Sequence, residues 1–186
     1  MEPRQVASVR GASNPAGPLR ALPAGPRPAH RPVLPGRQTS FVGRTSDLAE
    51  LTELLTVPDC RLVTIIGPGG IGKTRLAVEA ATAVRERFAD GVAFAPLQAV
   101  SDAGSLPTAL AAALGYALSG REDAREQVAR YLRPAHLLLV LDNLEHLLTE
   151  AVWLGDLLAT APGLRLLVTS RQALNLQEEW RYPLAG

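Results

Sequence analysis

The stretch RLVTII-GPGGIGKT, residues 61–74, decides the fold: an apolar, β-branched run leads directly into a glycine-rich loop. Its second part matches G-x-x-x-x-G-K-[ST] at every fixed position. Because glycine adopts positive φ without strain, such a loop can curl until successive N–H groups point inward and form a nest for anions. A helix that starts directly after the loop adds the positive end of its dipole. The stretch therefore predicts a strand, a phosphate-binding loop (P-loop) and a helix.

The loop residues have predicted roles in holding a nucleoside triphosphate, most simply ATP. The Lys73 ammonium is expected to reach the β- and γ-phosphates, and the Thr74 hydroxyl is expected to ligate Mg²⁺. Lys73 is the only lysine in a chain with 18 arginines, so this position holds the compact ammonium that phosphate binding uses. The alternative is a glycine-rich turn of purely structural role. The residues predicted to bind the phosphates are Gly67, Pro68, Gly69, Gly70, Ile71, Gly72, Lys73, Thr74 and Arg75.

Two charged residues follow other strand-like runs further along the chain. Asp142 closes the apolar run 136–141 (HLLLVL), where a carboxylate is costly unless it finds a metal or a charged partner. It is predicted to hold Mg²⁺ together with Thr74. Arg171 follows the run 164–169 (LRLLVT) and is predicted to bridge toward the γ-phosphate. The structural alternatives are a helix-capping Asp142 and a surface Arg171.

Strand-like runs alternate with helical patterns through most of the chain. We expect strands at 61–66, 91–95, 136–141, 164–169 and from 180, and helices before Pro58 and over 73–88, 105–118, 122–133 and 144–160. The alternation favours an α/β fold with a mainly parallel sheet, in which ligands bind beyond the carboxyl ends of the strands. The P-loop, Asp142 and Arg171 all fall at such ends. Trp153 and Trp180 are expected in the core.

Composition divides the chain near residue 38. Residues 1–38 hold eight of the fifteen prolines and six Arg against one Glu, a balance of +5. The remainder holds 13 basic and 17 acidic residues, a balance of −4. The first segment has too few large apolar side chains to offset its ordering entropy, so we expect a disordered Pro/Ala/Arg-rich leader. Residues 39–186 are expected to form one nucleotide-binding domain.

Charge and cysteine content exclude several classes of function. Cys60 is the only cysteine, so an internal disulfide or a cysteine metal cluster is impossible within one chain. The net charge of +1 gives no global signal for nucleic acid or a membrane surface, and the apolar runs are too short to span a bilayer. We expect a cytoplasmic protein without direct nucleic-acid or membrane contacts.

Four motifs beyond the P-loop, in the right order, resemble the STAND class of P-loop ATPases, and specifically the NB-ARC-like domain of bacterial LuxR/SARP-type transcriptional regulators. They are FVGR at 41–44, LLVLDNLEHLL at 138–148, TSR at 169–171 and WRYPL at 180–184. The resemblance covers about residues 39–186. It implies a three-layer P-loop NTPase fold with about five strands in the order 5-1-4-3-2, and ATP/ADP with Mg²⁺ as ligands. It also implies that the first motif lies against adenine and ribose through Phe41, Val42, Gly43 and Arg44.

The chain departs from the family pattern in two respects. Some members place a second acidic residue directly after the Walker B aspartate to activate water, whereas this chain has Asn143, which cannot accept a proton at neutral pH. Glu145 stands two residues further and is the candidate for that role, so we expect slow hydrolysis and tight nucleotide retention. The chain also ends at Gly186, before the helical lid and effector domains of the family. We therefore expect the core of a larger regulator, with other subunits or effector domains as partners, or else a truncated remnant.

The leading interpretation is a Mg²⁺-dependent ATP/ADP switch with slow ATP hydrolysis, whose two states differ in the γ-phosphate contacts of Lys73 and Arg171. A P-loop kinase is an alternative, and a DNA-binding regulator in its own right is another, although no helix-turn-helix pattern or zinc-ligand set occurs. A GTPase is disfavoured because its N-K-x-D motif needs a second lysine. The kinase would need a lid of arginines, but the four candidates alternate with acidic residues, which indicates a solvated helix face: Arg121, Arg125, Arg130 and Arg133.

Overall fold

The computed structural model describes residues 34–35 and 43–186. The sequence predictions that concern residues 1–33 and 36–42 lie outside the described residues. They include most of the expected disordered leader and two of the residues expected at adenine, Phe41 and Val42.

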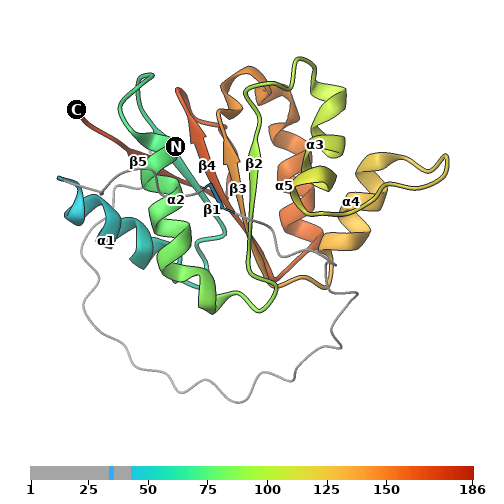
Figure 1. Ribbon diagram of the computed structural model, residues 1–186, viewed down its shortest axis with the longest axis horizontal. Helices are drawn as coiled ribbons and strands as arrows, with labels where there is room; N and C mark the ends of the chain where they lie inside the picture. Colours follow the sequence, from blue (N-terminus) through green and yellow to red (C-terminus); the bar gives the residue numbers. More distant parts are fainter. Residues whose placement is uncertain (1–33, 36–42) are drawn as a thin grey trace.

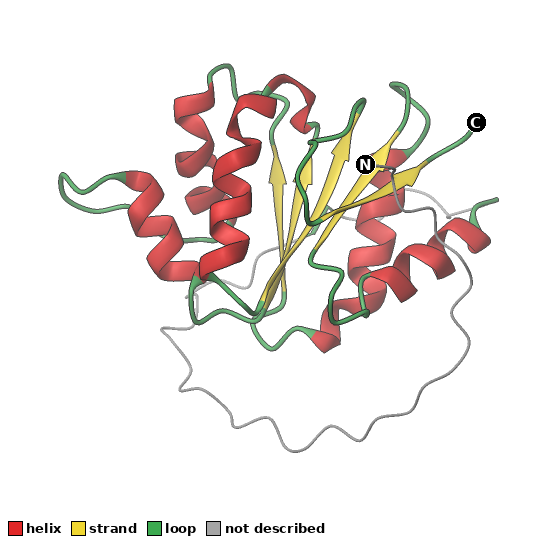
Figure 2. Ribbon diagram, turned by 180° about the vertical axis from the view of Figure 1, so that it is seen from behind, coloured by secondary structure: helices red, strands yellow, loops and turns green. Residues whose placement is uncertain are grey.

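A parallel sheet of five strands forms the centre of the described chain. Its spatial order is β2-β3-β4-β1-β5, and each neighbouring pair is parallel, so the arrows point to one edge (Figure 2). The order reads 5-1-4-3-2 in the other direction, so the predicted α/β, P-loop NTPase fold is confirmed. The strands are β1 (Leu62–Ile66), β2 (Val92–Pro96), β3 (Leu137–Asp142), β4 (Leu164–Ser170) and β5 (Glu179–Pro183).

Helices cover both faces of the sheet and make the fold three-layered (Figure 1). Helices α1 (Thr45–Leu54) and α2 (Lys73–Val84) lie on one face. The other face carries α3 (Leu106–Ala113), α4 (Ala124–Leu132) and α5 (Ala151–Thr160). Parallel sheets covered on both faces need apolar residues on both sides of each strand, which explains the unbroken apolar runs of the sequence.

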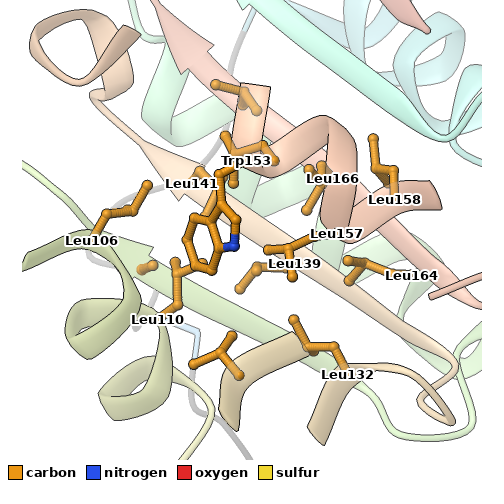
Figure 3. Close-up of a cluster of buried hydrophobic side chains, with 14 of the residues drawn as sticks. Leu106, Leu110, Leu132, Leu139, Leu141, Trp153, Leu157, Leu158, Leu164 and Leu166 are labelled. Carbon is orange, nitrogen blue, oxygen red and sulfur yellow. The ribbon is translucent and has the colours of Figure 1, made fainter. Parts of the chain in front are cut away.

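Each face of the sheet has its own hydrophobic cluster, and strand β3 contributes to both. Leu139 and Leu141 pack toward α3, α4 and α5, whereas Leu138 and Val140 pack toward α1 and α2. The larger cluster surrounds Trp153 of α5, whose indole lies among leucines from several elements (Figure 3). This two-sided core fixes β1, β3 and β4 side by side, and their carboxyl ends carry the predicted site.

Three details of the sequence prediction are wrong. The helix expected over 105–118 ends at Ala113, because Gly115, with φ of 65°, turns the chain. The helix expected over 144–160 is α-helical only from Ala151, and two 3-10 turns, Leu144–His146 and Leu148–Glu150, precede it. The reason lies at Asn143, whose left-handed conformation (φ 66°) turns the chain sharply after β3. Trp180 is 37% exposed because β5 is an edge strand, whereas Trp153 is buried as expected.

Candidate functional site

The P-loop lies between the carboxyl end of β1 and the start of α2. Gly70 and Gly72 have φ of 76° and 98°, a backbone region that costs other residues about 1–2 kcal/mol. Helix α2 begins at Lys73, directly after Gly72, so the positive end of its dipole lies at the loop. The Lys73 ammonium donates to the carbonyl oxygens of Gly67 at 2.8 Å and Pro68 at 2.9 Å. The loop thus holds its only lysine by two backbone contacts.

The two predicted Mg²⁺ ligands are in direct contact. Thr74 Oγ1 of α2 donates to Oδ1 of Asp142, the last residue of β3, at 2.7 Å, across 68 residues of sequence. Asp142 does not cap a helix, because the turn after β3 has Asn143 at its N-cap position and no side-chain cap. A hydroxyl and a carboxylate at the phosphate loop are the hard oxygen donors that Mg²⁺ prefers. The residues present therefore fit a Mg²⁺ ion.

A third residue, Thr169 of β4, completes this network, and no separate role was predicted for it. Its hydroxyl donates to Asp142 Oδ1 at 2.6 Å and accepts from the backbone N–H of Asn143 at 2.9 Å. Thr169 is 1% exposed. It therefore fixes both the carboxylate of Asp142 and the turn that follows it. The available signal in the sequence was a hydroxyl residue at the end of an otherwise apolar strand.

Arg171 and Glu145 form an ion pair beside the P-loop. Arg171 Nε lies 2.9 Å from Glu145 Oε1, and the two side chains are 66% and 16% exposed. The Arg171 guanidinium also lies over the loop, since its NH2 group is 3.5 Å from the position that a Cβ on Gly69 would take. The second carboxylate oxygen, Glu145 Oε2, is buried and has no hydrogen-bond partner within the described part of the chain. The turn after β3 thus places Glu145 beside the P-loop. There it pairs with Arg171, the arginine that follows β4 and is predicted to contact the γ-phosphate.

A cavity of about 330 Å³ joins these groups. Its size is at the low end of the range of roughly 300–1,000 Å³ for small-molecule sites. Asn143 and Thr169 form part of its wall. The predicted site residues that line it are Gly69, Gly70, Gly72, Lys73, Thr74, Arg75, Glu145 and Arg171.

The other predicted residues that the structure describes do not line this cavity. Arg44 NH2 donates to the carbonyl oxygens of Ile71 at 3.3 Å and Ala185 at 3.0 Å. Arg44 therefore ties the segment before α1 to the P-loop and to the residues that follow β5. Gly43, next to it, has φ of 89°. Asp142 reaches the cavity wall through its contact with Thr74.

Two of the four arginines considered for a kinase lid have partners away from the P-loop. Arg125 pairs with the buried Glu150 at 2.6 Å and lies over the ring of Trp153 at 5.2 Å. Arg130 pairs with Glu122. Both arginines belong to α4, on the face of the sheet opposite α2 (Figure 1). These contacts give both arginines a structural role away from the P-loop.

No helix within residues 43–186 combines the length and apolarity needed to cross a bilayer.

Comparison with known proteins identifies the family of the chain. The model of the AAA ATPase domain family matches residues 40–176. A Mycobacterium tuberculosis protein, provisionally named an HTH-type transcriptional regulator, is 37% identical over 126 residues, which is 66% of this chain and 14% of that protein. The regulatory protein AfsR of Streptomyces griseus is 32% identical over 174 residues, covering 82% of this chain and 18% of AfsR.

A solved structure shares the fold. It is the Signal Transduction ATPase with Numerous Domains (STAND) protein with a tetratricopeptide repeat sensor from Pyrococcus horikoshii, with a TM-score of 0.56 and 18% identity over 86% of this chain and 25% of that chain. This chain spans 37% or less of the length of the curated relatives that it matches. The family resemblance recognised in the motifs is confirmed, and the chain belongs to the AAA ATPase domain family.

Proposed function

We propose that this chain is a Mg²⁺-dependent ATP- and ADP-binding switch module with slow ATP hydrolysis, and that it works within a transcriptional regulator. The observation that carries the proposal is the 2.7 Å contact between Thr74 and Asp142 at the P-loop of an AAA ATPase domain. That contact joins the P-loop to a carboxylate, and a hydroxyl and a carboxylate together at such a loop support Mg²⁺-nucleotide binding.

Each site residue has a role in this proposal. The backbone N–H groups of 69–72 and the start of α2 bind the phosphates, and Lys73 exchanges its two carbonyl contacts for oxygens of the β- and γ-phosphates. Thr74 and Asp142 hold Mg²⁺, which supplies charge neutralisation to the phosphate oxygens. Arg171 contacts the γ-phosphate, so that ATP and ADP differ in the contacts they make. The segment of Gly43 and Arg44 lies on the adenine side.

Slow hydrolysis follows from the groups available as a base. Asn143, directly after Asp142, carries an amide that does not accept a proton at neutral pH. Glu145 is the carboxylate in the cavity wall, but it is engaged by Arg171 at 2.9 Å. We expect a steady-state turnover below about one per second, the low end of typical enzyme rates. A faster turnover by the purified chain would contradict this part of the proposal.

The regulatory setting rests on the relatives. One is named as an HTH-type transcriptional regulator and another as a regulatory protein, and both are much longer than the part they share with this chain. We propose that residues 39–186 act as the nucleotide-binding unit of such a protein in the cytoplasm. Its partners are then effector domains or other regulator subunits, and this unit makes no direct contact with nucleic acid or membranes.

The test is a calorimetric titration with ATP, ADP and GTP, each with and without Mg²⁺. Wild type is expected to bind the adenine nucleotides more tightly than GTP, and more tightly with Mg²⁺ than without. In Asp142→Asn the gain from Mg²⁺ is expected to vanish. Asp156→Asn, an exposed acidic residue of α5, is the matched control and should keep that gain. Equal Mg²⁺ dependence in the two variants would refute the assignment of the metal site.

A further inference from the structure

We propose that Glu145 and Arg171 form a partner-exchange latch, in which the Arg171 guanidinium binds either Glu145 or the terminal phosphate of ATP. Glu145 then competes with the γ-phosphate for Arg171 and lowers the affinity of the site for ATP relative to ADP. The inference rests on the proposed nucleotide site and adds to it a residue that sets the balance between the two nucleotides.

The position of the ion pair makes the exchange possible. Arg171 Nε is 2.9 Å from Glu145 Oε1, while the NH2 group of the same guanidinium lies 3.5 Å from the Cβ position of Gly69 in the P-loop. The guanidinium therefore pairs with the carboxylate while it lies beside the P-loop. Its side chain is 66% exposed, so a change of rotamer can carry the guanidinium from one partner to the other without repacking the core.

The charge of the Glu145 carboxylate is compensated by this arginine. Glu145 is 16% exposed, and its Oε2 is buried without a hydrogen-bond partner in the described residues. A carboxylate withdrawn from water is costly unless a cation or donors compensate it. Drawing Arg171 away to a phosphate leaves that cost in place, so the cost reduces the free energy gained by binding ATP.

The same exchange controls when Glu145 becomes available. Glu145 lines the cavity together with Lys73 and Thr74. While Arg171 is bound to it, its Oε1 is engaged; once Arg171 has moved, the carboxylate faces the cavity without its ion-pair partner. A γ-phosphate thus frees the one group proposed to accept a proton from water, and ADP does not. With this exchange, Glu145 is free to act as a base only when ATP is bound.

The latch predicts a difference between nucleotides, because a ligand shifts an equilibrium only through contacts that differ between the two states. Glu145→Gln keeps the shape of the side chain and removes the ionic attraction. It is expected to raise the affinity for the β,γ-imido analogue of ATP by about threefold to fivefold, the size of effect that partly exposed ion pairs allow. Affinity for ADP is expected to change by less than about twofold, since ADP leaves the pair intact.

The experiment is a titration of the full chain with Mg²⁺ and either the imido analogue or ADP. It compares wild type, Glu145→Gln, Arg171→Gln and the double variant. Removing a negative charge near the phosphates could itself favour the triphosphate, and the double variant separates the two causes. With a latch, Glu145→Gln has no effect once Arg171 is gone; with simple charge repulsion, its effect persists. Glu122→Gln breaks an exposed ion pair with Arg130 of α4 and serves as the control, with unchanged affinities expected.

Each outcome decides the question. A gain for the triphosphate that disappears in the Arg171→Gln background supports the latch. Equal gains for both nucleotides, no gain, or a gain that persists without Arg171 overturns it while leaving the proposed function intact. A folded wild type that binds neither nucleotide overturns the proposed function itself. If Glu145→Gln does not fold, Glu145→Asp withdraws the carboxylate by one methylene group and is expected to shift affinities in the same direction.

Discussion

Thr169→Val is expected to destabilise the protein and weaken Mg²⁺-nucleotide binding together. The substitution keeps the β-branched shape in β4 and removes one hydroxyl. That hydroxyl donates to the Asp142 carboxylate at 2.6 Å and accepts from the Asn143 N–H at 2.9 Å. Hydrogen bonds to charged groups contribute about 1.5–3 kcal/mol and neutral ones about 0.5–1.5 kcal/mol. The free energy of unfolding should therefore fall by about 2–4.5 kcal/mol, a large part of the roughly 5–15 kcal/mol typical of a domain.

The neighbouring strand offers a matched control. Thr64 of β1 lies opposite Val168 of β4 and is fully buried, yet its hydroxyl has no hydrogen-bond partner in the described residues. Burying an unpaired hydroxyl costs about 1–3 kcal/mol in mutational data. Thr64→Val therefore removes an unfavourable group and should leave stability unchanged or raise it. The same chemical change is expected to have opposite signs at two buried positions.

Urea unfolding of the nucleotide-free chain, followed by circular dichroism, measures both variants. Titration with Mg²⁺-ATP then measures the second expectation, that Thr169→Val alone weakens binding because Asp142 loses a donor that fixes its carboxylate. If the two variants lose equal stability, packing rather than the Thr169 hydrogen bonds holds this end of the sheet. If Thr169→Val is destabilised but binds Mg²⁺-ATP as wild type does, Thr169 has no part in placing the metal site.

Three further expectations concern the fold around the site. Burial raises the pKa of the Cys60 thiol to about 12, so alkylation of Cys60 at pH 8 should be slow in the native chain and faster in urea. Mg²⁺-ATP should slow the alkylation further if the nucleotide stabilises the fold. Fast alkylation of the native chain would contradict the burial of Cys60. Burial and the hydrogen bond to Asp47 raise the pKa of Tyr182. Because the folded state retains this proton, the free energy of unfolding should fall as pH rises above about 10, and it should fall less in Tyr182→Phe. Equal pH profiles of wild type and Tyr182→Phe in urea unfolding would contradict this expectation. Gly72→Ala places a side chain at φ 98° and should lower the free energy of unfolding by about 1–2 kcal/mol. It should also weaken nucleotide binding in the titration with Mg²⁺-ATP. An unchanged urea midpoint would show that the loop relaxes to accept the side chain.

Much of the fold was accessible from the sequence because the central strands β1, β3 and β4 are buried on both faces. Such strands read as unbroken apolar runs, as in 136–141, and their ends place the P-loop and Asp142 at one edge. The P-loop pattern directly gave the residues that we propose to bind phosphate. The strand order came from the family resemblance, since the apolar runs of the central strands do not show which strands are neighbours.

The parts that escaped prediction depend on single backbone conformations or on tertiary contacts. Asn143 has no sequence mark that distinguishes a left-handed turn from the start of a helix, so the turns before α5 and the inward direction of Glu145 were not predictable. The pairing of Glu145 with Arg171 joins residues from two strand ends that only the folded sheet brings together. Trp180 is exposed because β5 is the edge strand, a property of the sheet rather than of the local sequence.

The central claim is that the P-loop binds an adenine nucleotide through Lys73, and calorimetric titration of Mg²⁺-ATP into wild type and Lys73→Ala tests it most directly. Arg87→Ala, an exposed cation just beyond the far end of α2, is the control. We expect saturable binding by wild type and by the control, and none by Lys73→Ala, although all three unfold cooperatively in urea. Binding by Lys73→Ala as tight as that of wild type, or a folded wild type that binds no ATP, would contradict the claim.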